Sequence, residues 1–344
     1  MQLSMFDFEL PERLIAQYPT PSRDGSRLLV VYRHTQQIIH AHMRDLPQFL
    51  APQDVLVMNN TKVHKARLWA HKKTGGQAEI LLVRILENDC FEAMVRTSKV
   101  LIVGQTLIVA LNCELEVMQV LGQGLYVLKS KHMQVQACLD SYGHMPLPPY
   151  MNRTTESLDE QRYQTVYAKV PGSIAAPTAG LHLTHELLDT LRLKGVDIQT
   201  LTLHVGLGTF LPVREHAAQD IRQHVMHEES YVIDSLCVDS INNARKKQHL
   251  VVAVGTTSLR TLESVYLKYG TLKPDTGHTR LYVTPGFEFK VVDALLTNFH
   301  VPKSTLFVLV CSFLGTALAH RVYQEAIRES YRFYSYGDAC LLLP

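Results

Sequence analysis

The sequence has few cysteines and almost no excess of either charge. No two of its six cysteines lie within four residues of each other, which excludes a CxxC metal or redox pair and is typical of a reducing compartment. The formal net charge is +2, from 34 Lys and Arg against 32 Asp and Glu. A basic surface for nucleic acid must therefore be local rather than spread over the whole protein.

Long apolar runs and targeting signals are also missing. The most apolar tract, residues 304–315, is well short of the roughly 20 residues of a membrane span. The N-terminal segment carries Asp7 and Glu9 and lacks the basic region and apolar core of a signal peptide. With 46% hydrophobic residues, the composition is that of a globular protein with a sizeable core. We expect a cytoplasmic monomer with no membrane partner.

One section of the chain has the pattern of a small β domain. Between residues 64 and 140, short β-type runs follow one another at spacings near ten residues, with Gly, Asn or polar residues between them. The runs are 78–86, 90–97, 105–111, 113–121 and 124–130. This spacing predicts a small sandwich or barrel. The Pro-rich segment 143–150 then resembles a linker.

The rest of the chain alternates strands with helices. The predicted strands are 26–33, 54–61, 196–205, 249–255, 279–283 and 291–299. The predicted helices are 184–195, 235–248, 257–270, one that begins at Ser304, and 320–333. Alternation of this kind predicts an α/β fold, with a mixed twisted sheet flanked by helices and an inserted small all-β barrel. We assign 1–62 and 151–344 to the α/β domain and 63–150 to the barrel.

Four segments of the α/β part place Gly, Thr, Ser and His residues after a predicted strand or before a predicted helix. They are 175–182, 203–210, 253–260 and 295–306. Singly, each has a simple explanation, because Ser or Thr before a helix usually caps it and Gly usually forms a turn. Thr184 is such a cap. Open α/β sheets bind ligands at the carboxyl ends of their strands, so the recurrence of four such loops indicates a ligand site.

Known nucleotide-binding motifs do not account for these loops. The run GLGTFL has Leu211 where a dinucleotide motif needs its third Gly or Ala, and no P-loop occurs. Helix N-termini and exposed amides favour a carboxylate or a hydroxyl-rich ligand instead.

Histidines are the second signal. His182, His204, His227 and His300 are candidates for proton transfer, since the imidazole pKa is about 6.5, and His185 is a weaker one. His224, His227 and Glu229 have a spacing that can ligate zinc, but no further His or Cys anchors a metal pattern nearby. An acid–base or structural role is favoured there, and a metal-dependent hydrolase remains the alternative.

A basic run at 61–73 is the third signal. Lys62, Lys65 and Arg67 lie within seven residues of Trp69, the one tryptophan, along the sequence. Basic and aromatic side chains in this combination can bind a phosphate backbone. The same residues also fit the solvated edge of a barrel strand. A non-catalytic RNA-binding protein is therefore a second alternative.

Several long motifs resemble one family. They are FDFELPERLIAQYP, VLVMNNTKVHKARL, GHMPLPPY, VPGSIAAPTAGLHLT, LHVGLGTFLPV, HVMHEESY, VGTTSLRTLES, PGFEFKVVDALLTNFHVPKSTL and YRFYSYGDACLL. Together they are similar to the S-adenosylmethionine:tRNA ribosyltransferase-isomerase family, over essentially the whole chain.

The resemblance implies a step of queuosine synthesis on an α/β domain with an inserted barrel. The ribosyl part of S-adenosylmethionine would be transferred to the aminomethyl group of 7-aminomethyl-7-deazaguanine at the tRNA wobble position and isomerised. Epoxyqueuosine-tRNA, adenine and methionine would result. S-adenosylmethionine is then a substrate, and neither a metal nor another cofactor is expected.

This reaction implies roles for the candidate residues. The sulfonium acidifies the adjacent ribose carbon, so a base such as His204 or His227 begins the reaction, with Glu229 orienting its partner; His182 and His300 are the other proton-transfer candidates. Lys62, Lys65 and Arg67 would bind tRNA. The expected substrate-binding residues are Thr178, Gly180, Gly206, Gly208, Thr209, Thr256, Thr257, Ser258, Arg260, Asn298 and Ser304.

Overall fold

The computed structural model describes residues 1–148, 150–151, 153–206 and 220–344, and the chain divides into two compact units. The first contains Met1–Lys62, Gln164–Val170 and Ala176–Pro344, and the second contains Val63–Tyr163 and Pro171–Ala175. The strands β4 (Thr61–Val63) and β11 (Val170–Ser173), in which the chain passes from one unit to the other, pair as a separate two-stranded sheet.

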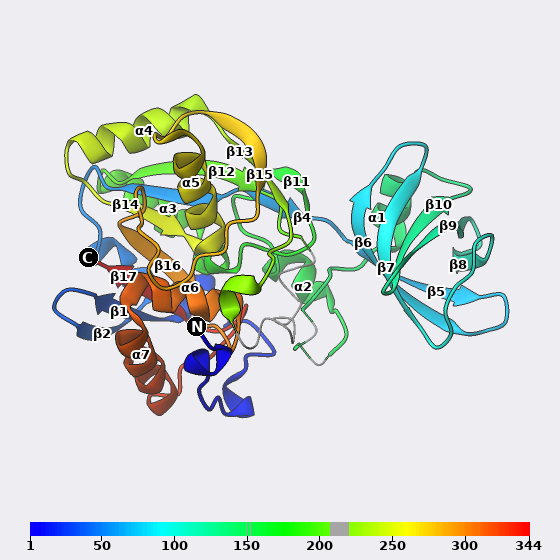
Figure 1. Ribbon diagram of the computed structural model, residues 1–344, viewed down its shortest axis with the longest axis horizontal. Helices are drawn as coiled ribbons and strands as arrows, with labels where there is room; N and C mark the ends of the chain where they lie inside the picture. Colours follow the sequence, from blue (N-terminus) through cyan, green and yellow to red (C-terminus); the bar gives the residue numbers. More distant parts are fainter. Residues whose placement is uncertain (149, 152, 207–219) are drawn as a thin grey trace. The chain divides into compact units, whose positions relative to one another are not determined.

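The first unit is built on a nine-stranded mixed sheet (Figure 1). Its strands, in spatial order, are β15 (Asp275–Thr279), β13 (Glu229–Ile233), β12 (Asp197–Leu203), β3 (Val55–Asn59), β14 (Val251–Val254), β16 (Ala294–Asn298), β17 (Ala339–Leu343), β1 (Arg27–Tyr32) and β2 (Gln37–His42). The neighbours β12, β3, β14 and β16 are parallel, whereas β17 runs antiparallel to β16. The α/β fold with a mixed sheet is confirmed.

Burial on both faces explains why the central strands are mostly apolar. Every residue of β3, β14, β16 and β17 is buried. Strands covered on both faces need continuous apolar sequence rather than alternation. Asn59 is the polar exception in β3, and both ends of its amide are hydrogen-bonded: its Nδ2 donates to the Leu203 carbonyl (2.9 Å) and its Oδ1 accepts the N–H groups of Thr61 (3.1 Å) and Leu203 (3.0 Å). This side chain fixes the end of β3 against β12.

Helical segments cover both faces of the sheet. One face packs in a single apolar cluster with η4 (Met43–Gln48), η5 (Thr178–His182) and α3 (His185–Leu193). The helices α4 (Ser235–Lys246) and α5 (Gly255–Tyr269) pack against the sheet outside that cluster (Figure 1). Thr184 caps α3, because its Oγ1 accepts the Leu187 N–H at 3.1 Å, which confirms the predicted cap.

A second core surrounds the last two helices. The helices α6 (Thr305–Leu314) and α7 (Thr316–Arg328) meet at a sharp bend of 114°. Aromatic rings fill the space next to them: Phe8, Phe299, Phe307, Tyr323 and Phe333 lie within aromatic contact distance of one another, for example 4.5 Å between the Phe307 and Tyr323 centroids. No single helix in the described ranges combines the length and apolar character needed to cross a bilayer; this bent pair meets that test only jointly.

The second unit contains the predicted barrel, which is confirmed. It is a closed barrel in the order β10-β7-β6-β5-β8-β9. The strands are β5 (Arg67–Lys72), β6 (Gln77–Ile85), β7 (Cys90–Thr97), β8 (Thr106–Ala110), β9 (Cys113–Gly122) and β10 (Leu125–Ser130), accompanied by α1 (Val135–Tyr142) and α2 (Ser157–Arg162). Inward and outward residues alternate along β5 and β10, as a filled barrel requires.

Element boundaries differ from those predicted from the sequence, and three of the differences are informative. The strand expected at 279–283 ends at Thr279, because the following segment leaves the ladder and the Leu281 carbonyl accepts the Arg260 Nε instead. The helix expected at 320–333 is α7, which ends at Arg328, since Ser330 has a positive φ of 56°. The segment 143–150 is not the end of the second unit, which extends to Tyr163.

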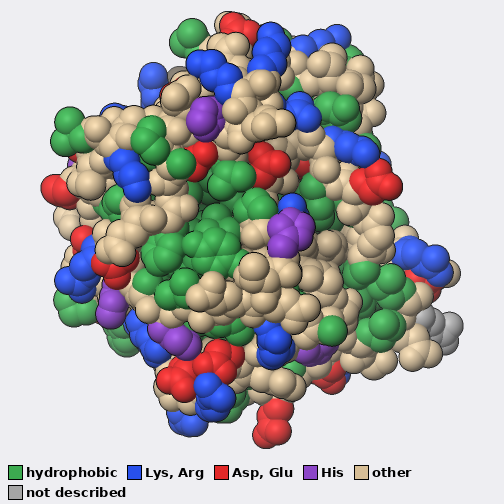
Figure 2. Space-filling view, turned by 90° about the vertical axis from the view of Figure 1, so that its left-hand side faces the viewer, with side chains coloured by type: hydrophobic (Ala, Val, Ile, Leu, Met, Phe, Trp, Pro, Cys, Tyr) green, Lys and Arg blue, Asp and Glu red, His purple; other side chains and the backbone are tan. Residues whose placement is uncertain are grey.

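Figure 2 shows one face of the molecule, with apolar side chains gathered in a central area. Side chains of both charge signs surround that area, and histidines lie among them. Neither sign dominates this face, in keeping with the formal net charge of +2.

Candidate active site

The described parts of the four Gly/Thr/Ser/His loops lie at one edge of the large sheet and are connected through contacts of their residues. The parallel strands β12, β14 and β16 end at this edge, and three of the loops follow them. The fourth is η5: His182 bonds to Asn298 at the end of β16, and a Cβ on Gly255 would lie 3.6 Å from the Ala179 Cβ. Gly206 and α5 are connected through Glu229. The loops therefore form one site, as expected for strand carboxyl ends.

His182 is held from both sides. Its Nδ1 lies 2.8 Å from the Ser26 Oγ, and its Nε2 lies 2.9 Å from the Asn298 Nδ2. With the amide nitrogen donating to Nε2, the ring proton resides on Nδ1. The imidazole is buried, so it positions η5 against β16 rather than offering an open nitrogen to a substrate.

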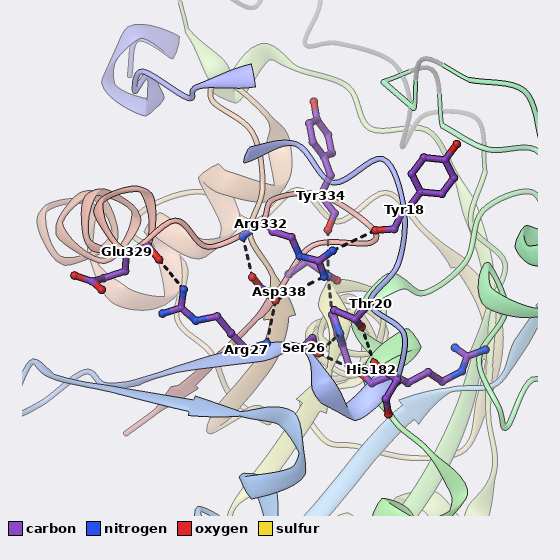
Figure 3. A network of polar contacts seen from close by, with 12 residues as sticks. Tyr18, Thr20, Ser26, Arg27, His182, Glu329, Arg332, Tyr334 and Asp338 are labelled. Atoms are coloured by element: carbon purple, nitrogen blue, oxygen red, sulfur yellow. Dashed lines mark hydrogen bonds and ion pairs between the residues drawn. The ribbon is translucent and has the colours of Figure 1, made fainter. Parts of the chain in front are cut away.

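Figure 3 shows the polar network next to this histidine. The carboxylate of Asp338 is buried and accepts the backbone N–H groups of Arg27 (2.9 Å) and Arg332 (2.8 Å). The Arg27 guanidinium also lies 3.7 Å from the Tyr331 ring centroid. These contacts hold the start of β1 against the segment that precedes β17, and thus anchor Ser26, the partner of His182.

Gly180 lacks a side chain for a reason other than ligand access. A Cβ at this position would lie 1.9 Å from the Tyr167 hydroxyl oxygen and 3.0 Å from the Thr165 Cγ2. The space is therefore taken by Tyr167, whose pKa is raised by burial. Packing against Tyr167 therefore accounts for the glycine at position 180, which was expected to bind substrate; Thr178, two residues earlier, is half-buried.

Glu229 and Arg260 form a buried ion pair. The Oε2 of Glu229 accepts from the Arg260 Nη1, and its Oε1 accepts the Gly206 N–H at 3.1 Å. The Arg260 Nε donates to the Leu281 carbonyl at 2.9 Å. Glu229 thus fixes Gly206 and α5 rather than orienting a histidine, which corrects the role expected from the sequence.

The remaining histidines differ in their surroundings. His204 follows β12, is half-buried, and has its Nδ1 2.8 Å from the Thr61 Oγ1. His227 is exposed, as is His185 at the start of α3. His300 is buried, with its Nε2 3.0 Å from the Thr297 Oγ1, and desolvation lowers its pKa to about 3. An imidazole with that pKa is a weak base at neutral pH, and we assign His300 a structural role.

Two side-chain hydroxyls that were expected to bind substrate are already hydrogen-bonded to helix backbone groups. Ser304 caps α6, since its Oγ accepts the Phe307 N–H at 3.1 Å, and the Ser258 Oγ donates to the Val254 carbonyl at 2.9 Å. Thr256 and Thr257 are half-buried at the start of α5. Gly208 and Thr209 lie outside the described residues.

The alternative of a metal site at His224, His227 and Glu229 finds no support in the described residues. Within the described residues, no group of three or more His, Cys, Asp or Glu side chains is placed to hold a metal ion. The His224 ring packs edge-on against Tyr282, with 5.4 Å between centroids.

The three basic residues of the run 61–73 that were expected to bind tRNA differ in their contacts. Lys65 pairs with Glu160 at 3.0 Å, and Arg67 pairs with Glu79 at 3.0 Å while donating to the Leu147 carbonyl at 2.9 Å. Burial lowers the pKa of the Arg67 guanidinium. Lys62 is exposed. Arg67 therefore stabilises the second unit, and Lys62 is the residue of the three that best fits a phosphate contact.

Comparison with known proteins identifies the family. A family model described as queuosine biosynthesis protein matches residues 3–342. The chain belongs to this family.

Relatives of the queuosine biosynthesis family match over their full length. The Nitrosomonas europaea protein named S-adenosylmethionine:tRNA ribosyltransferase-isomerase is 46% identical over 99% of this chain and 96% of its own. The protein of that name from Moorella thermoacetica is 45% identical over 100% of both chains. A crystal structure of S-adenosylmethionine tRNA ribosyltransferase from Thermotoga maritima is 34% identical, covers 98% of this chain and 100% of that one, and has a TM-score of 0.57. The resemblance seen in the motifs is confirmed.

The sequence analysis did not predict several residues of the site. Tyr167, Ser26 and Thr61 contact Gly180, His182 and His204, respectively. No strand–loop–helix signal marks them, because each is brought to the site by tertiary packing. The motif VLVMNNTKV was the one available signal for Thr61.

We predict that Gly180→Ala lowers the free energy of unfolding by about 1–3 kcal/mol, because the new methyl group displaces the Tyr167 ring. Adding Tyr167→Phe should recover part of this loss, since the hydroxyl is the closest atom. Thermal and urea denaturation of both variants and of Tyr167→Phe alone measure the coupling. Equal stability of wild type and Gly180→Ala would contradict the packing.

We predict that His300 contributes to loss of stability in acid. Its folded pKa of about 3 lies below the ordinary value of about 6.5, so the unfolded state takes up a proton first as the pH falls. By pH 5 this costs about 2 kcal/mol, with full stability retained above about pH 6.5. In urea titrations between pH 7 and 5, His300→Gln should show a shallower fall in stability than wild type. The exposed His185→Gln serves as the control, and an unchanged slope in His300→Gln would refute the prediction.

Proposed function

We propose that this chain transfers the ribosyl part of S-adenosylmethionine to the aminomethyl group of 7-aminomethyl-7-deazaguanine at the wobble position of tRNA and isomerises it. Epoxyqueuosine-tRNA, adenine and methionine are the products. The proposal is supported by family membership over residues 3–342 together with relatives that carry this enzyme name at about 45% identity.

The observation that carries the proposal is the single site formed by four loops at one edge of the sheet. Helix starts, glycine amides and threonine hydroxyls there suit a ligand with a carboxylate and ribose hydroxyls. Three histidines from different loops, His182, His204 and His300, also reach this edge, and their environments separate their roles.

His204 is the best-placed proton acceptor among them. It is half-buried rather than enclosed, and its contact with Thr61 orients the ring. His182 has both ring nitrogens occupied, and the pKa of His300 is lowered to about 3. A sulfonium acidifies the neighbouring ribose carbon, so His204 removes that proton and Glu229 acts as a positioning residue through Gly206 and Arg260.

We predict that His204→Gln lowers the rate of adenine release about 10²- to 10⁴-fold, the usual contribution of a general base. Release of adenine from S-adenosylmethionine in the presence of modified tRNA is the measurement. His185→Gln changes an exposed histidine at the start of α3 and should keep the wild-type rate. A wild-type rate in His204→Gln would show that another group takes the proton.

We also predict a role for Lys62 in tRNA binding. It is exposed and follows Thr61, which contacts His204 at the site. Lys62→Glu should weaken tRNA binding and reduce the salt dependence by about one counterion. Binding at several salt concentrations measures this, with Lys246→Glu, a change of an exposed lysine in the last turn of α4, as the matched charge reversal. Arg67→Glu should instead lower the melting temperature, and unchanged tRNA binding in Lys62→Glu would move the RNA surface elsewhere.

A further inference from the structure

The start of α5 is built differently from the other helix starts of this site. Thr184 and Ser304 cap α3 and α6, but Val254 occupies the cap position of α5, where no side-chain cap is formed. Gly255, with φ of +82°, lets the chain turn directly from β14 into the helix. A helix of 15 residues thus presents its positive end without a side chain to neutralise it.

Two polar atoms of α5 are buried without a hydrogen-bond partner. Within α5, the Thr257 Oγ1 and the Arg260 Nη2 have no hydrogen-bond partner among the described residues. Arg260 is only 6% exposed, and its other nitrogens are used by Glu229 and the Leu281 carbonyl. A buried guanidinium nitrogen without a hydrogen-bond acceptor costs free energy. We therefore expect a ligand to supply an acceptor there.

Both atoms belong to the same side of the same helix end. Thr257 and Arg260 are three residues apart, and side chains at that spacing are neighbours. Long helical side chains lean toward the helix N-terminus, which brings the Arg260 head toward the first turn. The Thr257 Oγ1 lies 3.7 Å from the position of a Gly255 Cβ, and the Ala179 Cβ lies 3.6 Å from the same position.

The geometry points to a carboxylate subsite, and we infer that it binds the methionine carboxylate of S-adenosylmethionine. One carboxylate oxygen accepts from the Arg260 Nη2, and the other accepts from the Thr257 hydroxyl and the amides of the first turn. The Glu229–Arg260 pair is neutral as a unit, and the positive helix end compensates the added charge. This assignment rests on the proposed function, because it takes S-adenosylmethionine as the ligand.

The subsite also sets the direction of the substrate. With the carboxylate at α5, the amino-acid end of S-adenosylmethionine is anchored between η5 and the Glu229–Arg260 pair. Thr257 and Arg260 are then binding residues, and neither takes part in bond breaking.

The direct test compares S-adenosylmethionine with its decarboxylated analogue, which keeps the sulfonium, adenosine and amine. Calorimetric titration of wild-type protein should show about 10- to 100-fold weaker binding of the analogue, the effect of losing charge-assisted hydrogen bonds. Equal affinities for the two ligands would overturn the inference. This comparison needs no variant, so a folding defect cannot obscure it.

Two variants locate the effect. Thr257→Val removes only the hydroxyl and should weaken S-adenosylmethionine binding about 5- to 10-fold while leaving the analogue unchanged. Arg260→Lys retains one cation for Glu229 but loses the second nitrogen, and it should act in the same way. Thr261→Val is the matched control, because its Oγ1 already donates to the Thr257 carbonyl at 3.0 Å, and it should change neither affinity.

The outcomes separate this inference from the proposed function. Turnover of S-adenosylmethionine with no preference for its carboxylate would leave the function intact and overturn the subsite. A Thr257→Val variant with weakened tRNA affinity and unchanged S-adenosylmethionine affinity would assign the anion to a tRNA phosphate and overturn it as well. Failure of the wild-type protein to bind S-adenosylmethionine or to release adenine would refute both.

Discussion

Parallel pairing of β12, β3, β14 and β16 is the constraint on which the candidate site depends. Parallel neighbours end at the same edge of a sheet, so the segments that follow them meet regardless of their separation in sequence. Gly206, Gly255 and Asn298 come together in this way. The antiparallel strand β17, next to β16, marks the limit of that edge.

The Glu229–Arg260 pair is the second element of the arrangement. Two buried charges cost desolvation free energy, and such pairs are weak evidence for stability on their own. Here the pair connects the start of β13 to α5, and the Gly206 amide completes the shell of the carboxylate. Its value is geometric, because it holds two loops at fixed positions and leaves one guanidinium nitrogen available for an acceptor.

Environment rather than residue type separates the histidines. Burial without a charged partner lowers the pKa of His300, and two hydrogen bonds engage both nitrogens of His182. His204 has a neighbouring hydroxyl and partial solvent access. Histidine can therefore fill space in the core, connect two segments by hydrogen bonds, or act as a base, depending on the residues that the tertiary structure places around it.

The fold class, the barrel and the four loops could be predicted from the sequence, because periodicity, turn residues and capping residues are local signals. Strand order, pairing direction and the contacts of each side chain could not, because they depend on residues that are distant along the chain. Gly180 illustrates this: the sequence shows a residue without a side chain, and Tyr167, 13 positions earlier, decides that the space is filled. Glu229 likewise lies near histidines in the sequence, yet it pairs with Arg260. A buried carboxylate is stable only with a hydrogen-bonded or charged partner, and the fold places Arg260 beside it.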